Sequence, residues 1–156
     1  MEVDLSFVGT ATAPFTVEVE RGSIRLFAEA IQDDSPHYRE VAVARALGYA
    51  DLVAPPTFPT SFRPPRRQPW MLGLDEGRIL AGEQYFKYQR PILAGDVLEC
   101  RLHLVAVEEK QGRSGRMQML IQELRAVDAG GRLVVANGRV VVYRSPGALA
   151  ATPAKG

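Results

Sequence analysis

The sequence is poor in the residue types that metal and disulfide sites require, with one cysteine and two histidines in 156 residues. Cys100 alone cannot form an intrachain disulfide, and it has no second thiol with which to build a metal site. A chain of this length buries roughly 70% of its extended surface on folding, so its core needs neither kind of support. The composition therefore predicts a globular protein without a metal centre or cofactor, in which Cys100 is an inert core thiol.

The sequence also lacks an excess of one charge and any long apolar run. Nineteen basic residues against 18 acidic ones leave a formal net charge of +1, which argues against nucleic acid as the main partner. No stretch approaches the roughly 18 apolar residues of a transmembrane helix. The opening residues MEVD carry acids instead of the basic residues of a signal peptide. We therefore expect a cytoplasmic protein, with no membrane association, that acts on a small molecule or a protein partner.

Periodicity predicts a strand and two helices in the first third of the chain. Residues 12–20 alternate apolar and polar side chains, as a strand with one buried face does. Ser23 is expected to cap a helix whose apolar residues recur at helical spacing. This helix should end at residues 32–36, where acids and a proline favour a turn. A second helix is expected over residues 39–47, with Gly48 at its end.

The remainder predicts a loop followed by a sheet. Six of the 11 prolines lie in residues 54–69, so no long regular element fits there. Beyond Gly82, alternation and turn residues predict strands over residues 83–88, 98–106, 116–127 and 133–143. Front helices and consecutive antiparallel strands predict an α+β fold with one sheet packed on a helix. We expect a single domain over residues 1–145 and a flexible C-terminal tail over residues 146–156.

Of the two histidines, His37 is the candidate for chemistry. His103 shares a strand face with Glu99 and Arg101 and is expected to be solvated or paired across the sheet. His37 follows Asp33 in the turn between the two helices, where a carboxylate and an imidazole could reach the hydrogen-bonding range of general acid–base catalysis. The alternative is that the acids only end the first helix and that His37 opens the second.

Three blocks of the sequence are similar to known motifs. FAEAIQDDSPHY at residues 27–38 is similar to S-G-D-x-N-P-L-H, the signature of R-specific enoyl-thioester hydratases and dehydratases. GYADLVAPPTF at residues 48–58 resembles V-A-P-P-T-F, and GEQYFKYQRPILAGD at residues 82–96 resembles G-E-Q-x-F-x-Y-x-R-P-L-x-x-G-D. In these blocks and in their order, the chain resembles the MaoC-like N-terminal dehydratase domains. The resemblance implies a hot-dog fold, a long antiparallel sheet wrapped around a helix, which dimerises edge to edge and holds acyl thioesters at the dimer interface.

The resemblance also implies a degenerate catalytic motif. Asp33 takes the position of the catalytic aspartate, and the position of the catalytic histidine falls on Tyr38. A one-residue deletion would instead make His37 the catalytic histidine. Active hydratases have an A-H-G run whose glycine N–H binds the thioester oxygen, but this chain has APP, and Pro56 has no N–H to donate.

Further residues are candidates for substrate binding. Arg63, Arg66 and Arg67 form the only basic cluster, which is either a solvated loop or a contact for the phosphates of coenzyme A or of a carrier's phosphopantetheine. The full set of expected binding residues is Ala54, Pro56, Thr57, Phe58, Arg63, Arg66 and Arg67.

Four functions are compatible with these residues. The leading hypothesis is a hydratase- or dehydratase-type subunit for enoyl or 3-hydroxyacyl thioesters, which binds the acyl chain while a partner hot-dog chain supplies the Asp/His pair. A tyrosine with a pKa near 10 is a poor base, and the loss of one oxyanion donor costs roughly a hundred- to a thousandfold in rate. The alternatives are a homodimeric R-specific enoyl-CoA hydratase using Asp33 and His37, a non-catalytic acyl-thioester-binding protein, and a hot-dog thioesterase.

Overall fold

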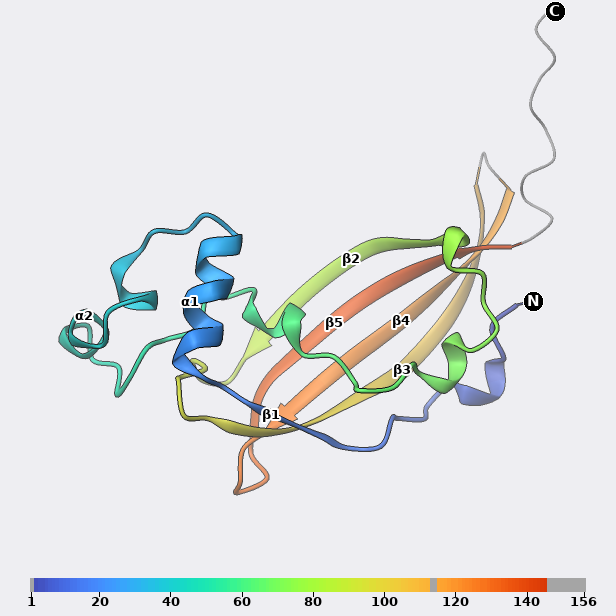
Figure 1. Ribbon diagram of the computed structural model, residues 1–156. Coiled ribbons are helices and arrows are strands. Elements are labelled where there is room, and N and C mark those ends of the chain that lie inside the picture. The colour runs from blue at the N-terminus through green and yellow to red at the C-terminus, as the bar shows by residue number, and fades with distance from the viewer. Residues whose placement is uncertain (1, 113–114, 146–156) are drawn as a thin grey trace, which may run out of the picture.

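A single antiparallel sheet organises the molecule in the computed structural model, which describes residues 2–112 and 115–145. Its five strands lie in the order β1-β3-β4-β5-β2. The strands are β1 (Phe15–Glu18), β2 (Ile79–Tyr88), β3 (Val97–Gly112), β4 (Gly115–Val127) and β5 (Leu133–Arg144). Figure 1 shows β3, β4 and β5 running side by side as one long, curved surface. The α+β fold with one long sheet is therefore confirmed, while the expected tail at residues 146–156 lies outside the described residues.

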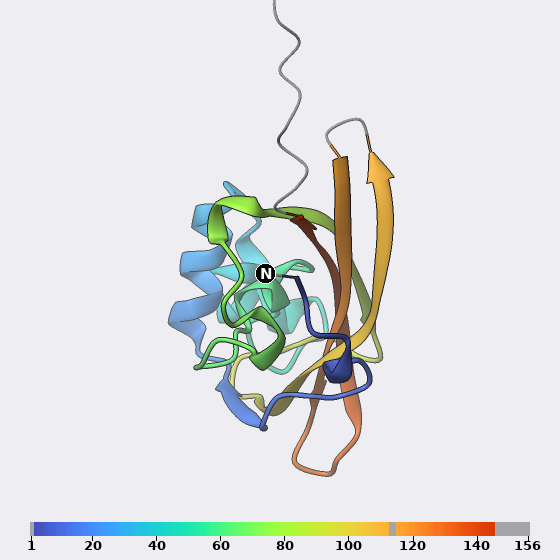
Figure 2. The same cartoon turned by 90° about the vertical axis from the view of Figure 1, so that its right-hand side faces the viewer.

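The helices and the proline-rich loop cover one face of the sheet and leave the other face bare (Figure 2). The α-helices are α1 (Arg21–Ala30) and α2 (Val41–Ala46). The 3-10 turns are η1 (Leu5–Phe7), η2 (Pro36–Tyr38), η3 (Phe58–Ser61), η4 (Pro69–Met71) and η5 (Glu76–Arg78). Residues 54–69 thus contain only short turns, as the prolines predict.

Boundaries differ from the expected ones at β1 and β3, and also at α1, α2 and β2. The first helix begins at Arg21, so Ser23 lies inside its first turn and Glu20 occupies the N-cap position without a side-chain hydrogen bond. The second helix begins at Val41 because residues 36–38 form a 3-10 turn that opens on a proline. Strand β2 begins at Ile79, ahead of the expected start, because it pairs with the end of β5.

The core lies between α1 and the covered face of the sheet. Ile24 and Ala28 of α1 are fully buried, at the spacing of one helical face. They belong to one cluster with the alternating apolar residues of β3 and β4, which are Leu98, Cys100, Leu102, Leu104, Leu120, Leu124 and Ala126. Burial raises the pKa of the Cys100 thiol to about 12, and its expected place in the core is confirmed.

A bidentate ion pair joins the start of α1 to the chain that follows α2. Arg21 donates from Nε to Oδ1 of Asp51 at 2.8 Å and from Nη2 to Oδ2 at 2.6 Å. Asp51 Oδ1 also accepts the N–H of Leu52, a fully buried residue, at 2.7 Å. The hydrogen bond from Arg21 is the main reason that the pKa of Asp51 is lowered to about 2. The pair therefore positions the segment that enters the loop at residues 52–56.

The depressed pKa of Asp51 predicts a pH-dependent stability. An unfolded aspartate has a pKa of about 3.9, so the ion pair stabilises the fold above about pH 4 and this contribution is lost as the pH falls toward about 2. Wild type should have a higher Tm than Asp51→Asn at pH 7, and the difference should vanish across that acidic window. Thermal unfolding of both proteins from pH 2 to pH 7 measures it. A Tm difference that does not change with pH would contradict this assignment.

Candidate functional site

A cavity of about 430 Å³ opens beside the turn that follows α1. Its walls come from three stretches of the chain that are far apart in sequence. The lining residues are His37 and Tyr38 of η2, Tyr49, Val53, Ala54 and Pro56 after α2, and Tyr88, Gln89, Arg90, Pro91 and Ile92 at the end of β2. Because three phenol rings line it, we call it the tyrosine cavity.

Backbone pairing holds two of these walls together. The Ala54 N–H donates to the Ile92 carbonyl at 2.8 Å, and the Ala94 N–H donates to the Leu52 carbonyl at 2.9 Å. Val53 forms an isolated bridge between them, opposite Leu93. The loop after α2 is thus attached to the bend between β2 and β3.

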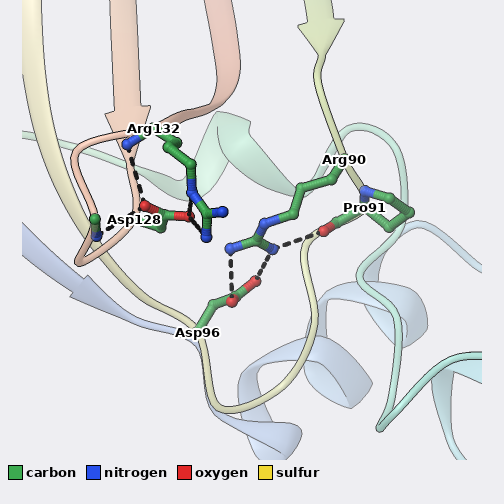
Figure 3. A network of polar contacts seen from close by, with 6 residues as sticks. Arg90, Pro91, Asp96, Asp128 and Arg132 are labelled. Atoms are coloured by element: carbon green, nitrogen blue, oxygen red, sulfur yellow. Dashed lines mark hydrogen bonds and ion pairs between the residues drawn. The ribbon is translucent and has the colours of Figure 1, made fainter.

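The bend itself is closed by Arg90 and Asp96 (Figure 3). Arg90 donates from Nη1 to Oδ2 of Asp96 at 2.8 Å and from Nη2 to Oδ1 at 3.0 Å. Arg90 Nη1 also donates to the Pro91 carbonyl at 3.0 Å, and Asp96 Oδ2 accepts the Leu93 N–H at 2.9 Å. Figure 3 shows Asp128 of the turn between β4 and β5 beside this network. Since Asp96 already neutralises Arg90, this guanidinium is a structural brace in the cavity wall.

Two of the phenols in the cavity, Tyr38 and Tyr88, remain protonated at physiological pH. Burial raises the pKa of Tyr88, whose hydroxyl donates to the Pro56 carbonyl at 2.8 Å. Burial also raises the pKa of Tyr38, assisted by the negative charge of Asp33. These rings can therefore contact a ligand or hydrogen-bond it, but they are poor bases.

The expected acid–base residues do not form a hydrogen-bonded pair among the described residues. Asp33 Oδ1 accepts the N–H of Ser35 at 3.0 Å. Hydrogen bonding by Ser35, from its side chain first and from its backbone second, lowers the pKa of Asp33. Asp33 is absent from the cavity lining, whereas His37 and Tyr38 both line it with ring centroids 4.1 Å apart. The structure thus brings both candidates for the histidine position to one wall.

The expected binding residues separate into several places. Ala54 and Pro56 line the tyrosine cavity, while Thr57 is exposed outside its lining. Phe58 is buried and contacts Phe27 and Phe62 edge to face, with centroids 5.3 and 5.6 Å away.

The three arginines of the basic cluster also lie in different places. Arg63 lines a cavity at strand β2, whereas Arg66 and Arg67 line a proline-rich groove next to residues 11–14. Arg67 is held by Glu76 at 2.5 Å. A phosphate contact by Arg66 and Arg67 stays a prediction. The other histidine, His103, lies half-buried opposite Glu123 of β4, in the cross-strand position expected of it.

Sequence reasoning did not assign a role to Tyr49, Tyr88 or residues 89–92. All of them fall inside two of the blocks that carry the family resemblance, residues 48–58 and 82–96. The resemblance therefore covered these residues, but it did not indicate what any of them does. Their meeting in one cavity depends on the pairing of residues 52–54 with 92–94.

Within residues 2–112 and 115–145, no three His, Cys, Asp or Glu side chains lie close enough together to hold a metal ion. In the same part of the chain, no helix has the length and apolarity needed to cross a membrane.

Comparison with known proteins agrees with this architecture. Residues 6–137 match the model of the FAS1-like dehydratase domain region. A UPF0336 protein of Thermobifida fusca is 36% identical over 154 residues, which cover 92% of this chain and 95% of that protein. A UPF0336 protein of Streptomyces griseus is 45% identical over 122 residues, which cover 72% and 78% of the two chains.

A solved structure shows the same fold. It is a chain of the HadBC complex of Mycobacterium tuberculosis, described as a 3R-hydroxyacyl-ACP dehydratase, with a TM-score of 0.73 and 27% identity. The match covers 91% of this chain and 99% of that one. The chain therefore belongs to the family of MaoC-like, FAS1-type dehydratase-region domains and has their hot-dog fold.

Proposed function

We propose that the chain is the acyl-binding subunit of a hydratase or dehydratase acting on enoyl or 3-hydroxyacyl thioesters, and that a second hot-dog chain supplies the Asp/His pair. The observation that carries this proposal is the chemistry of the tyrosine cavity. Its walls offer apolar side chains and protonated phenols, but no carboxylate hydrogen-bonded to an imidazole. Such a cavity suits the binding of an acyl thioester better than proton transfer to it.

The oxyanion position supports the same division of labour. Adding water to an enoyl thioester requires a hydrogen-bond donor where the enolate charge develops. Here Pro56 lacks an N–H, and its carbonyl accepts a hydrogen bond from Tyr88. This wall of the cavity therefore presents an acceptor where the reaction needs a donor.

The similarity to a chain of the HadBC complex supports a partner of related fold, because that dehydratase is a complex of different chains. The free edge of the sheet at β2 supports it as well, since long unpaired edges associate. We infer that substrate binds in the tyrosine cavity and extends to the partner's catalytic residues.

One observation favours a second candidate, a homodimeric hydratase. His37 lines the cavity four residues after Asp33, and it is one of the lesser causes that lower the pKa of Asp33. In that case His37 would act as the base.

The two candidates predict different behaviour of the purified chain. Alone, it should hydrate crotonyl-CoA at a rate near background, because it lacks both the oxyanion donor and the coupled base. Absorbance of the enoyl thioester measures the rate. A rate within about tenfold of an ordinary hydratase that is lost in His37→Ala would instead establish the homodimeric enzyme.

In a complex with a hot-dog chain that has an intact G-D-x-N-P-L-H motif, mutations in the two subunits should have different effects. Replacing the partner's motif histidine should abolish kcat. His37→Ala and Tyr88→Phe in this chain should raise KM while kcat changes little, because both residues contact substrate without transferring protons. Steady-state kinetics with enoyl-CoAs of increasing length test this.

Tyr85→Phe is the matched control for Tyr88→Phe. Tyr85 lies on the opposite face of β2, where its hydroxyl donates to Glu123 at 2.7 Å. The Tyr85→Phe substitution should therefore leave KM unchanged. Loss of kcat in His37→Ala, or failure of the two chains to co-purify, would contradict the division of labour.

A further inference from the structure

A second cavity, of about 320 Å³, lies at the free edge of the sheet. It is lined by Thr60 and Arg63, by residues 79–84 of β2 and by residues 139–141 of β5. The pairing of β2 with β5 shifts between Ala81 and Gln84, so a bulge forms the rim. We call this cavity the arginine pocket.

The covered face of the sheet is not completely covered at this edge. On β4, the residues of that face are buried, including Gln122 at 1% exposure. On β2, the residues of the same face, Ala81 and Gln84, are exposed. The arginine pocket is therefore an open part of the covered face.

Arg139 projects from β5 into this open part. It lies between Gln122 of β4 and Gln84 of β2 in the sheet register, so it is on the covered face. Its Nη2 donates to Gln122 Oε1 at 3.2 Å, but its buried Nε has no acceptor, and neither has the buried Nε2 of Gln122. Buried donors without acceptors are uncommon and indicate a missing partner.

No carboxylate neutralises Arg139. Among the described residues, the ion pairs include neither Arg139 nor Arg63. Burial and the positive charge of Arg63 lower the pKa of Arg139, yet a guanidinium stays protonated in proteins. Glu83 also lines the pocket, so two cations face one exposed acid. An uncompensated charge in such a place is costly unless a counter-ion pairs with it.

The two cavities lie on the same strand. Gln84 of the arginine pocket and Tyr88 of the tyrosine cavity are four residues apart on one face of β2, which is about 13 Å in an extended strand. The loop after α2 connects them too, since Pro56 lines the first cavity and Thr60 the second. A ligand with one end in each would run along the inner side of β2.

We propose that the arginine pocket binds a phosphate ester, namely a phosphate of the arm that carries the acyl thioester, through Arg139 and Arg63. This inference rests on the proposed function and deepens it by naming where the charged end of the substrate is held. Guanidinium groups suit this role because their N–H donors match phosphate oxygens bidentately. Arg139 is a binding residue here, and its orphaned Nε supplies the donor.

Titration calorimetry with 4′-phosphopantetheine and with unphosphorylated pantetheine tests the pocket. Wild type should bind the phosphorylated compound at least tenfold more tightly, and Arg139→Met and Arg63→Met should each remove that preference. Arg144→Met is the matched control, because Arg144 lies on the same strand but on the opposite face. It should keep the preference.

Thermal unfolding without ligand separates binding from a structural role. Arg139→Met should change Tm little, because removal of a half-buried charge that no described carboxylate pairs offsets the loss of its hydrogen bond to Gln122. Equal binding of the two pantetheine compounds by wild type, together with equal binding of coenzyme A and dephospho-coenzyme A, would overturn the proposal. So would a lower Tm in Arg139→Met together with an intact phosphate preference. If Arg139→Met does not fold, Arg63→Met, at an exposed position, decides the binding test alone.

A second arm distinguishes the source of the phosphate. Tighter binding of coenzyme A than of dephospho-coenzyme A would assign the pocket to the 3′-phosphate, which carrier proteins lack. Equal binding of these two, with the preference for phosphopantetheine retained, would assign it to the phosphate that coenzyme A and carrier proteins share.

Failure of the proposed function would look different. If phosphopantetheine binds in an Arg139-dependent way but His37→Ala and Tyr88→Phe leave acyl-thioester affinity unchanged, the arginine pocket stands and the role of the tyrosine cavity is wrong. If those two variants weaken acyl-thioester binding while the phosphate group contributes nothing, only the arginine pocket is wrong.

Discussion

The ion pair between Arg90 and Asp96 closes the bend between β2 and β3, and the tyrosine cavity depends on it. Both nitrogens of the guanidinium fork contact both carboxylate oxygens, and the carboxylate also accepts a backbone N–H of the bend. The bend then offers backbone groups to residues 52–54, which bring Ala54 to the cavity. A second bidentate pair, Arg21 with Asp51, attaches the same segment to α1. Two ion pairs therefore fix the position of one loop, the first at the bend between β2 and β3 and the second at α1.

The cavity that results has the character of a binding site. The raised pKa values keep Tyr38 and Tyr88 protonated, and one carboxylate oxygen of Asp33 accepts the N–H of Ser35. The Pro56 carbonyl accepts a hydrogen bond from Tyr88, and in the proposed function Pro56 stands where an active hydratase has its oxyanion donor. These departures act together, because base and oxyanion donor serve a single transition state. A cavity with this chemistry is consistent with a subunit that positions substrate for a related partner.

Both cavities are lined in part by β2, the strand at the free edge of the sheet. The inner-face residues of β4 are buried, whereas Ala81 and Gln84 on the same face of β2 are exposed. Beside them, Arg139 and Arg63 form no ion pair with a carboxylate of the described residues. A second chain docking at this edge would enclose a ligand that runs from the arginine pocket to the tyrosine cavity. Binding of substrate and association of the subunits would then be thermodynamically linked, because each event would be more favourable once the other had occurred.

The sequence by itself determined the elements whose signals are local. Alternation of apolar residues predicted the long strands, helical spacing predicted α1, and the prolines excluded a regular element from residues 54–69. The resemblance of three blocks also identified the hot-dog fold. Ser23 was wrongly assigned as the cap of α1, because a helix boundary depends on contacts such as the one between Arg21 and Asp51, 30 residues away. Only the tertiary structure decided which side chains share a cavity. Tyr88 and His37 line one cavity, and Arg139 and Arg63 line another. Sheet register and loop pairing bring these segments together, although they are far apart along the chain and nothing in their sequence indicates that they are close in space.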